Sequence, residues 1–314
     1  MKLSRLIILS YLSALTLIAC QPSTIKQSEK KLEPVPAYST SKQFNDYWYN
    51  NQAELDRYEL RQARYGSYRN GDAVFVFVTE HMNPETHVKA WNAKDQDIPV
   101  MKMNQSRKFI TGIYPYSIMS SVFTPVNLEA NPFTLRETFT GQEWCGQEFT
   151  RLDYSGTGYE GMLDSYFPDE GDQPLNLGNA MLEDEIYTRI RINPESLPLG
   201  DVLVIPSMQH NRFRHLEIGV QKANTKSTDS VVDNQNLKIY TLNYQKIDRS
   251  LSVVFEAEFP HKILQFRESF LSGFGDDAHK MTTVGTLTNS IMLDYWTKNN
   301  PQDTTYRKSL GLSQ

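Results

Sequence analysis

The chain has 314 residues, of which 39% are hydrophobic and 22% charged, and its formal net charge is -5. This is the composition of a folded globular protein, and it argues against a dedicated nucleic-acid-binding protein, which needs clustered Lys and Arg to contact phosphates. Two cysteines are too few for a disulfide scaffold or for a zinc site made of cysteine alone.

The first twenty residues are predicted to be a secretion signal. Lys2 and Arg5 flank the start of an apolar stretch over residues 6–18, which is shorter than the roughly 20 residues that a membrane-spanning helix needs. The run Leu17-Ile18-Ala19-Cys20 resembles the lipobox of bacterial lipoproteins, whose cysteine is acylated and becomes the mature N-terminus. We therefore expect a signal peptide over residues 1–19 and acyl chains such as palmitate on Cys20. The alternative is an ordinary secretory peptide with an incidental cysteine.

The residues after Cys20 bear on where the protein resides. By resemblance to bacterial lipoproteins, Gln21 in place of Asp directs the chain to the outer membrane, where we expect it to face the periplasm. Residues 20–42 are rich in Ser, Thr, Lys, Pro and Gln, a composition typical of a flexible tether. The lipid is expected to provide the anchoring, because removal of Lys2 and Arg5 leaves a more acidic mature chain.

Residues 43–314 are predicted to form a single domain, because no polar gap long enough for a linker interrupts the apolar residues. The aromatic and apolar residues of the first segment fall near one helical face, so we expect one or two short helices that end at Gly66. The residues on this face are Tyr47, Trp48, Leu55, Tyr58 and Tyr65.

Most of the domain is predicted to be β-structure. Short runs of β-branched and aromatic residues recur about every ten residues, and Gly, Pro or Asn-Gly separate them. Expected strands lie over residues 73–80, 99–104, 108–114, 116–123, 132–139, 201–206, 214–223, 237–247 and 251–259. We expect a turn at Asn70-Gly71, a helix over residues 179–192, a hairpin at 248–250 and a last helix around Ile291 and Trp296. The fold class is mainly β (α+β): a large antiparallel sheet or half-barrel, similar to that of periplasmic lipoprotein carriers, with a few helices packed on it.

The six histidines do not form a metal-ligand motif. If residues 210–215 are extended, an offset of five places His210 and His215 on opposite faces of the sheet. We expect neither a metal site nor a cofactor.

Two short runs could carry chemistry. Cys145 follows Trp144 and could be a thiolate nucleophile, but a free cysteine is more often a buried small hydrophobe, here beside a packed Trp. The acidic run at residues 183–185 could supply paired carboxylates or bind a cation. Consecutive helix positions point about 100° apart, so we favour a solvated helix face.

Aromatic clusters supply the candidate ligand-facing residues. Such rings can stack on sugars or line a lipid groove, whereas most aromatics in a sheet form core and cross-strand pairs. The candidates are Tyr47, Trp48, Tyr114, Tyr116 and Trp144.

Several runs of the chain together resemble one group of bacterial proteins. They are Tyr47-Trp48-Tyr49 and residues 58–66, 111–119, 143–147, 182–191 and 293–299. In these runs the chain resembles uncharacterised secreted bacterial lipoproteins often labelled "septum formation inhibitor Maf". True Maf proteins are similar to cytoplasmic nucleotide pyrophosphatases with a serine-proline-arginine-arginine motif, which this chain lacks. The resemblance implies no established activity or site, and we do not expect nucleotide pyrophosphatase activity or septum inhibition.

These observations favour a lipid-anchored, non-catalytic periplasmic lipoprotein of the outer membrane. It would bind an apolar ligand, an envelope polymer such as a glycan, or a partner protein. One alternative is a hydrolase that acts on envelope material through carboxylates brought together by the fold. Another is a structural or assembly subunit. An apolar groove would favour lipid binding, and an aromatic rim would favour glycan binding. A polar cleft that contains a buried acid would favour catalysis.

Overall fold

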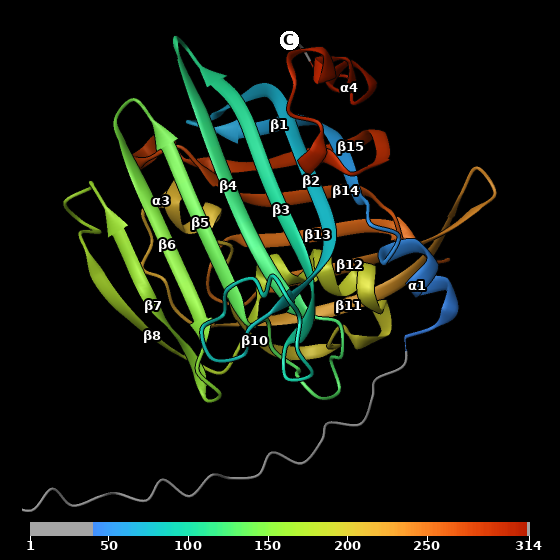
Figure 1. Cartoon of the computed structure of the whole chain (residues 1–314). Helices are drawn as coiled ribbons and strands as arrows, with labels where there is room; N and C mark the ends of the chain where they lie inside the picture. The colour runs from blue at the N-terminus through green and yellow to red at the C-terminus, as the bar shows by residue number, and fades with distance from the viewer. Residues whose placement is uncertain (1–39, 313–314) are drawn as a thin grey trace, which may run out of the picture. The chain divides into compact units, whose positions relative to one another are not determined.

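Fifteen strands of the described chain pair into one continuous sheet (Figure 1). The computed structural model describes residues 40–312, so the predicted signal peptide, Cys20 and nearly all of the tether lie outside it. Strands make up 55% of the structure and helices 15%, which confirms the predicted mainly β class. Within residues 40–312, no helix has the length and apolar character that crossing a membrane requires.

The sheet consists of two antiparallel meanders that meet in its middle. Its strand order is β8-β7-β6-β5-β4-β3-β2-β1-β15-β14-β13-β12-β11-β10-β9. Neighbours are antiparallel except β9 and β10, which are parallel, and the described sheet is not closed into a barrel. The strands are β1 Ala53–Arg64, β2 Ser67–Met82, β3 Ile98–Thr111, β4 Tyr114–Pro125, β5 Arg136–Glu143, β6 Gly146–Tyr154, β7 Gly158–Ser165, β8 Gln173–Gly178, β9 Met181–Leu182, β10 Gly200–Ile205, β11 Gln221–Val232, β12 Gln235–Tyr244, β13 Arg249–Glu256, β14 Ile263–Ser272 and β15 His279–Leu293.

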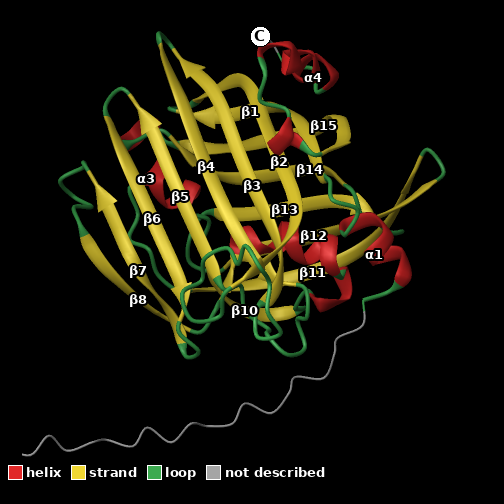
Figure 2. Ribbon diagram, in the orientation of Figure 1, coloured by secondary structure: helices red, strands yellow, loops and turns green. Residues whose placement is uncertain are grey.

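Helices α2 and α3 lie between the two meanders, whereas α4 lies near the C-terminus (Figure 2). The helices are α1 Lys42–Trp48, α2 Ile186–Ile192, α3 Met208–Arg214 and α4 Thr305–Ser309, with 3-10 turns η1 Glu183–Glu185, η2 Pro194–Ser196, η3 Gly275–Asp277, η4 Tyr295–Thr297 and η5 Pro301–Thr304. Every residue of α2 is buried. Tyr187 of α2 packs against Phe75 of β2 and Phe266 of β14, so this helix contacts both meanders. The concave side of the sheet is therefore filled by protein.

Strand alternation builds the main core. Along β13, Leu251, Val253 and Phe255 are buried while the residues between them are partly exposed. At the other end of the chain, Phe44 and Trp48 lie one helical turn apart on α1 and bury their rings in the same core. We call the side that faces α2 and α3 the inner face of the sheet, and the opposite side the outer face.

Buried ion pairs cross the space between the meanders. Arg107 of β3 forms two bonds of 2.8 Å with Glu268 of β14. Arg191 of α2 bonds to Glu54 of β1 through both terminal nitrogens, at 2.5 and 2.8 Å. The interior is thus held together by paired charges as well as by apolar packing.

The acidic run at residues 183–185 is buried, so the predicted solvated helix face is wrong. Glu183 pairs with Arg249 of β13, Asp184 accepts a hydrogen bond from Ser207, and Glu185 pairs with Arg189. The three carboxylates diverge, as consecutive helical positions must. They are buried because each has its own partner within the core, which sequence spacing does not reveal.

The predicted helix up to Gly66 is wrong beyond Trp48. Leu55 and Tyr58 lie on β1, which pairs with β2 on one side and β15 on the other. Both faces of this central strand are covered, and most of its residues are buried. The alternation of apolar and polar residues that marks a strand is therefore weak, and the near-helical spacing of its apolar residues arises by chance.

The predicted turn at Asn70-Gly71 is also wrong, because β2 runs straight through it. The turn lies at Tyr65-Gly66 instead, between β1 and β2. A Cβ atom on Gly71 would lie 2.2 Å from the main-chain oxygen of Lys108. Glycine is needed there because strand β3 approaches closely, which is the other common reason for glycine in a strand.

Two further segments differ from the predictions. Ile291 lies on β15 and Trp296 in η4, so the last predicted helix is a strand followed by a single 3-10 turn. Residues 210–215 form the end of α3 and its cap instead of a strand, with His210 buried and His215 at the surface. The expected helix over residues 179–192 is helical only from Glu183 onward.

Candidate functional site

A groove of about 900 Å³ opens on the outer face of the sheet across β2, β3 and β4. Along β3, Ser106, Lys108 and Ile110 face this groove and alternate with Arg107 and Phe109, which are buried on the inner side. The side chain of Ile110 is 59% exposed. The floor of the groove therefore combines apolar and hydroxyl groups from adjacent strands.

The C-terminal segment, residues 293–312, forms the facing wall. Leu310 packs against Leu55 of β1 and Val78 of β2 in an apolar cluster that is separate from the main core. Tyr295 and Tyr306 of this segment also line the groove. The wall is therefore fixed to the sheet by its own apolar contacts.

The charges of the groove are mostly neutralised by neighbours. Asp72 accepts bonds of 2.8 and 2.6 Å from Arg57, and Lys298 pairs with Asp294 at 2.9 Å. Lys108 is exposed and makes no side-chain ion pair within residues 40–312. An apolar groove with one uncompensated ammonium group suits an amphiphile with an apolar body and an anionic head.

A second, smaller pocket of about 460 Å³ lies on the outer face of β5, β6 and β7. Its lining includes Gln142, Glu148, Asp164, Tyr166 and Asp172. Polar side chains and one exposed ring of this kind resemble the lining of sites that bind sugars.

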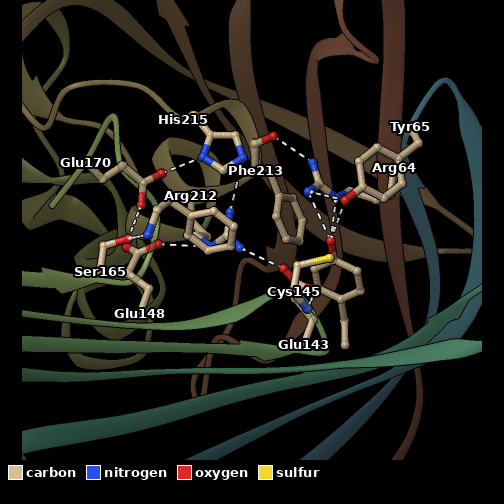
Figure 3. Close-up of polar contacts among 12 residues, drawn as sticks. Arg64, Tyr65, Glu143, Cys145, Glu148, Ser165, Glu170, Arg212, Phe213 and His215 are labelled. Carbon is tan, nitrogen blue, oxygen red and sulfur yellow. Dashed lines mark hydrogen bonds and ion pairs between the residues drawn. The ribbon is translucent and has the colours of Figure 1, made fainter.

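On the inner side, a polar cluster joins α3 to the β5–β6 hairpin (Figure 3). Arg212, near the end of α3, lies 3.0 Å from Glu143 of β5 and 3.1 Å from Glu148 of β6. The ring of Phe167 packs on its guanidinium, 4.0 Å from the ring centroid. Both acids and the arginine are buried, so this cluster seals the loop end of the fold.

Glu148 has a raised pKa in this cluster. Burial, and then the negative charge of Glu170, raise its pKa to about 8, although Arg212 opposes the shift. Near neutral pH, the carboxyl group of Glu148 that faces Arg212 is thus largely protonated. Alternation along β6 turns Glu148 towards Arg212 and Gln147 towards the opposite face, and both residues are among those that line the small pocket.

Ser165, Glu170 and His215 form a chain of contacts that resembles a catalytic triad in composition only. The Nδ1 atom of His215 lies 2.6 Å from Glu170, and Ser165 donates its hydroxyl hydrogen to the same carboxylate. In a triad the histidine lies between the nucleophile and the acid. Here the acid lies between them, so Ser165 has no base to activate it within this chain of contacts.

The predicted ligand-facing aromatics separate into three groups. Tyr114 and Trp144 stack at the tips of neighbouring hairpins, with ring centroids 6.1 Å apart, and Trp144 is 69% exposed. Trp48 and Tyr116 are buried core residues, although Tyr116 is among the residues that line the groove. Tyr47 is partly buried and donates to Glu54.

Cys145 lies in the two-residue turn between β5 and β6, where it is exposed. The prediction of a buried cysteine beside a packed Trp is therefore wrong, because both residues of the turn project outward. A hydrogen bond to Glu143 and burial raise the pKa of the thiol. A raised pKa argues against an activated thiolate nucleophile.

Among residues 40–312, no three His, Cys, Asp or Glu side chains are arranged to hold a metal ion. Sequence reasoning missed the groove, whose residues come from β2, β3, β4 and the C-terminal segment. The alternation of Ser106, Lys108 and Ile110 was a signal of one exposed strand face, but only the fold shows which segment covers it. In comparisons with protein families, curated proteins and solved structures, nothing matches this chain.

Proposed function

We propose that the protein is a lipid-anchored, non-catalytic lipoprotein of the outer membrane that faces the periplasm and binds an amphiphilic envelope molecule. Cys20 would carry the lipid, and residues 21–42 would tether the folded domain to the membrane. The ligand would lie in the groove on the outer face, with its apolar body against Ile110 and its anionic head near Lys108.

The groove of about 900 Å³ is the observation that carries this proposal. Pockets for small molecules span roughly 300–1,000 Å³ and are lined mainly by apolar and aromatic groups with a few polar ones. Val74, Ile110, Leu293 and Tyr306 supply the apolar lining, and Lys108 supplies a charge. The binding site thus lies outside the sheet, in contrast to a carrier that holds lipid on its concave side, because α2 and α3 fill that side.

The hydrolase alternative finds weaker support. The small pocket contains the carboxylates of Asp164 and Asp172, which an acid and base pair would require. Glu148, the acid with the raised pKa, also lines this pocket, but its carboxyl group lies 3.1 Å from Arg212 and is engaged there. A structural or assembly subunit is supported by no specific contact in residues 40–312.

Displacement of a fluorescent fatty-acid analogue tests the groove. We expect the wild-type protein to bind the analogue, and Ile110→Asp to weaken binding at least about tenfold, because a carboxylate would be placed against the apolar part of the ligand. The matched control is Ile113→Asp, which changes an exposed isoleucine three residues away that does not line the groove. Equal binding by the two variants would contradict the proposal.

The anchor is tested separately. Growth with labelled palmitate should label the wild-type chain, and Cys20→Ser should abolish the labelling and release the protein from the membrane fraction. Labelling that persists in Cys20→Ser would rule out this cysteine as the lipid anchor.

A further inference from the structure

Arg64, at the end of β1, differs from every other buried arginine of the described chain. It is only 4% exposed, yet it forms no ion pair with a carboxylate of residues 40–312. The remaining buried arginines each pair with at least one acid: Arg107, Arg189, Arg191, Arg212 and Arg249. A buried charge without a counter-charge is costly, so this position requires a physical explanation.

Neutral groups satisfy the hydrogen bonds of Arg64 without neutralising its charge. Its Nη1 atom donates to the main-chain oxygen of Phe213 at 2.7 Å, and its Nη2 atom donates to the hydroxyl groups of Tyr65 and Tyr116 at 3.0 and 3.1 Å. The rings of Tyr65 and Phe213 lie 4.0 and 4.8 Å from the guanidinium carbon. These contacts hold the guanidinium in place and leave it positively charged.

A second cation, Arg214, follows directly after Phe213, whose main-chain oxygen accepts from Arg64. Arg214 ends α3 and donates to the main-chain oxygen of Gly273, with Phe274 packed against it. Burial, and then the positive charge of Arg64, lower the pKa of Arg214. Within residues 40–312, Arg214 makes no ion pair with a carboxylate either. Two neighbouring arginines at one end of the fold therefore share an uncompensated charge.

Glu143 and Glu170, two acids of the neighbouring polar cluster, do not neutralise this charge. Glu143 pairs with Arg212 and also accepts the main-chain N–H of Cys145. Glu170 is engaged by His215 and Ser165. Figure 3 shows Arg64 beside Tyr65 and Phe213, apart from the contacts that Arg212 makes with these acids.

We propose that Arg64 and Arg214 form a binding site for a phosphate group, distinct from the outer groove. Two guanidinium groups match the charge of a phosphate monoester, which approaches two negative charges near neutral pH. The hydroxyl of Tyr65 supplies a further donor when Tyr116 donates in the 2.8 Å bond between the two phenols, in which either can be the donor. Tyr65 is 37% exposed and Phe274 47%, and their rings lie 6.2 Å apart, so an aromatic rim is available for a sugar attached to the phosphate.

Calorimetric titration of the full-length protein in nonionic detergent tests this site. The probes are inorganic phosphate and glucosamine 1-phosphate at constant ionic strength, with chloride as the reference anion. We expect saturable binding of at least one probe, and Arg214→Gln to weaken that binding about tenfold or more. Arg267→Gln is the matched control, because Arg267 is an exposed arginine of β14 that lies outside the cluster.

The outcomes separate the sources of the phosphate. Tighter binding of glucosamine 1-phosphate than of inorganic phosphate supports a phosphorylated envelope glycan, and equal binding supports the free anion. Failure of both probes to bind, or equal weakening by Arg214→Gln and Arg267→Gln, overturns the proposal. The melting temperature of Arg214→Gln without phosphate, measured in parallel, shows whether the variant keeps the wild-type fold.

Discussion

Arg107 and Glu268 are 161 residues apart in the chain and form a buried, two-point ion pair. They join β3 of one meander to β14 of the other, across the space that α2 and α3 occupy. The ring of Phe266 packs on the guanidinium, 4.7 Å away. The pair therefore fixes how the two halves of the sheet face each other.

Removing one partner of this pair should destabilise the fold more than removing both. Glu268→Ala leaves a buried guanidinium without its acid, and we expect a loss of about 3–5 kcal/mol in the free energy of unfolding. The double variant Arg107→Met, Glu268→Leu should lose less, because no buried charge remains. Urea unfolding of both variants measures the difference, and an equal or larger loss in the double variant would contradict this account.

The same pair predicts sensitivity to acid. Burial alone would raise the pKa of Glu268, but Arg107 reverses this and holds the pKa below its ordinary value. A depressed pKa in the folded state adds stability above the ordinary pKa of the carboxyl group, and this contribution is lost as the pH falls through the depressed value. The wild-type protein should therefore lose stability at acidic pH more steeply than the double variant does.

Glu148 predicts the opposite pH dependence. Its pKa of about 8 lies above the value of an unfolded glutamate, so folding favours the protonated form. Stability from this group is fully present below about pH 4.5 and is lost as the pH rises towards 8. Glu148→Gln should therefore be more stable than wild type at pH 8.5, by roughly 2–4 kcal/mol. Urea unfolding at several pH values measures this, with the exposed Glu160→Gln on β7 as the control.

Gly71 is predicted to be intolerant of any side chain. The Cβ of Gly71→Ala would lie 2.2 Å from the carbonyl oxygen of Lys108 and 2.8 Å from the Cβ of Phe109. Strands β2 and β3 would have to separate, and we expect a loss of about 1–3 kcal/mol. Gly178→Ala is the control, since nothing lies within 4 Å of its added carbon. Similar free energies of unfolding for the two variants would contradict this prediction, because they would show that β3 can move away from β2 at little cost.

Cys145 is predicted to react slowly with thiol reagents despite its exposure. Glu143 raises the pKa of the thiol, and only the thiolate attacks. In a Cys20→Ser background, where Cys145 is the remaining cysteine, Glu143→Gln should speed alkylation at pH 8 several-fold. The rate of maleimide labelling measures this, and an unchanged rate would show that Glu143 does not control the thiol.

The sequence predicted those parts of the fold that local pattern decides. Alternation in residues 251–259 correctly placed β13, because one face of that strand is buried and the other is partly exposed. It failed for β1, a central strand buried on both faces, and for the run at residues 183–185, whose burial depends on partners as distant as Arg249. Ion pairs and hydrogen bonds across the interior join residues that are far apart in the chain, so local periodicity of the sequence cannot predict them.

The candidate site was predicted less completely than the fold. Tyr114 and Trp144 were identified as aromatic candidates and do lie together at the surface. The groove was not predicted, because it forms only where the C-terminal segment packs on the outer face of β1 and β2. The lack of an acidic partner for Arg64 was not predicted either, because it can be recognised only from the contacts in the folded structure.

Native mass spectrometry of the full-length protein, extracted from its membrane in nonionic detergent, tests the central claim most directly. We predict that an acyl-chain molecule co-purifies with the wild type and with Ile113→Asp, as mass beyond that of the covalent lipid, and that it is absent from Ile110→Asp. The account would be contradicted by a bound mass that persists in Ile110→Asp, or by a wild-type protein that carries no ligand at all.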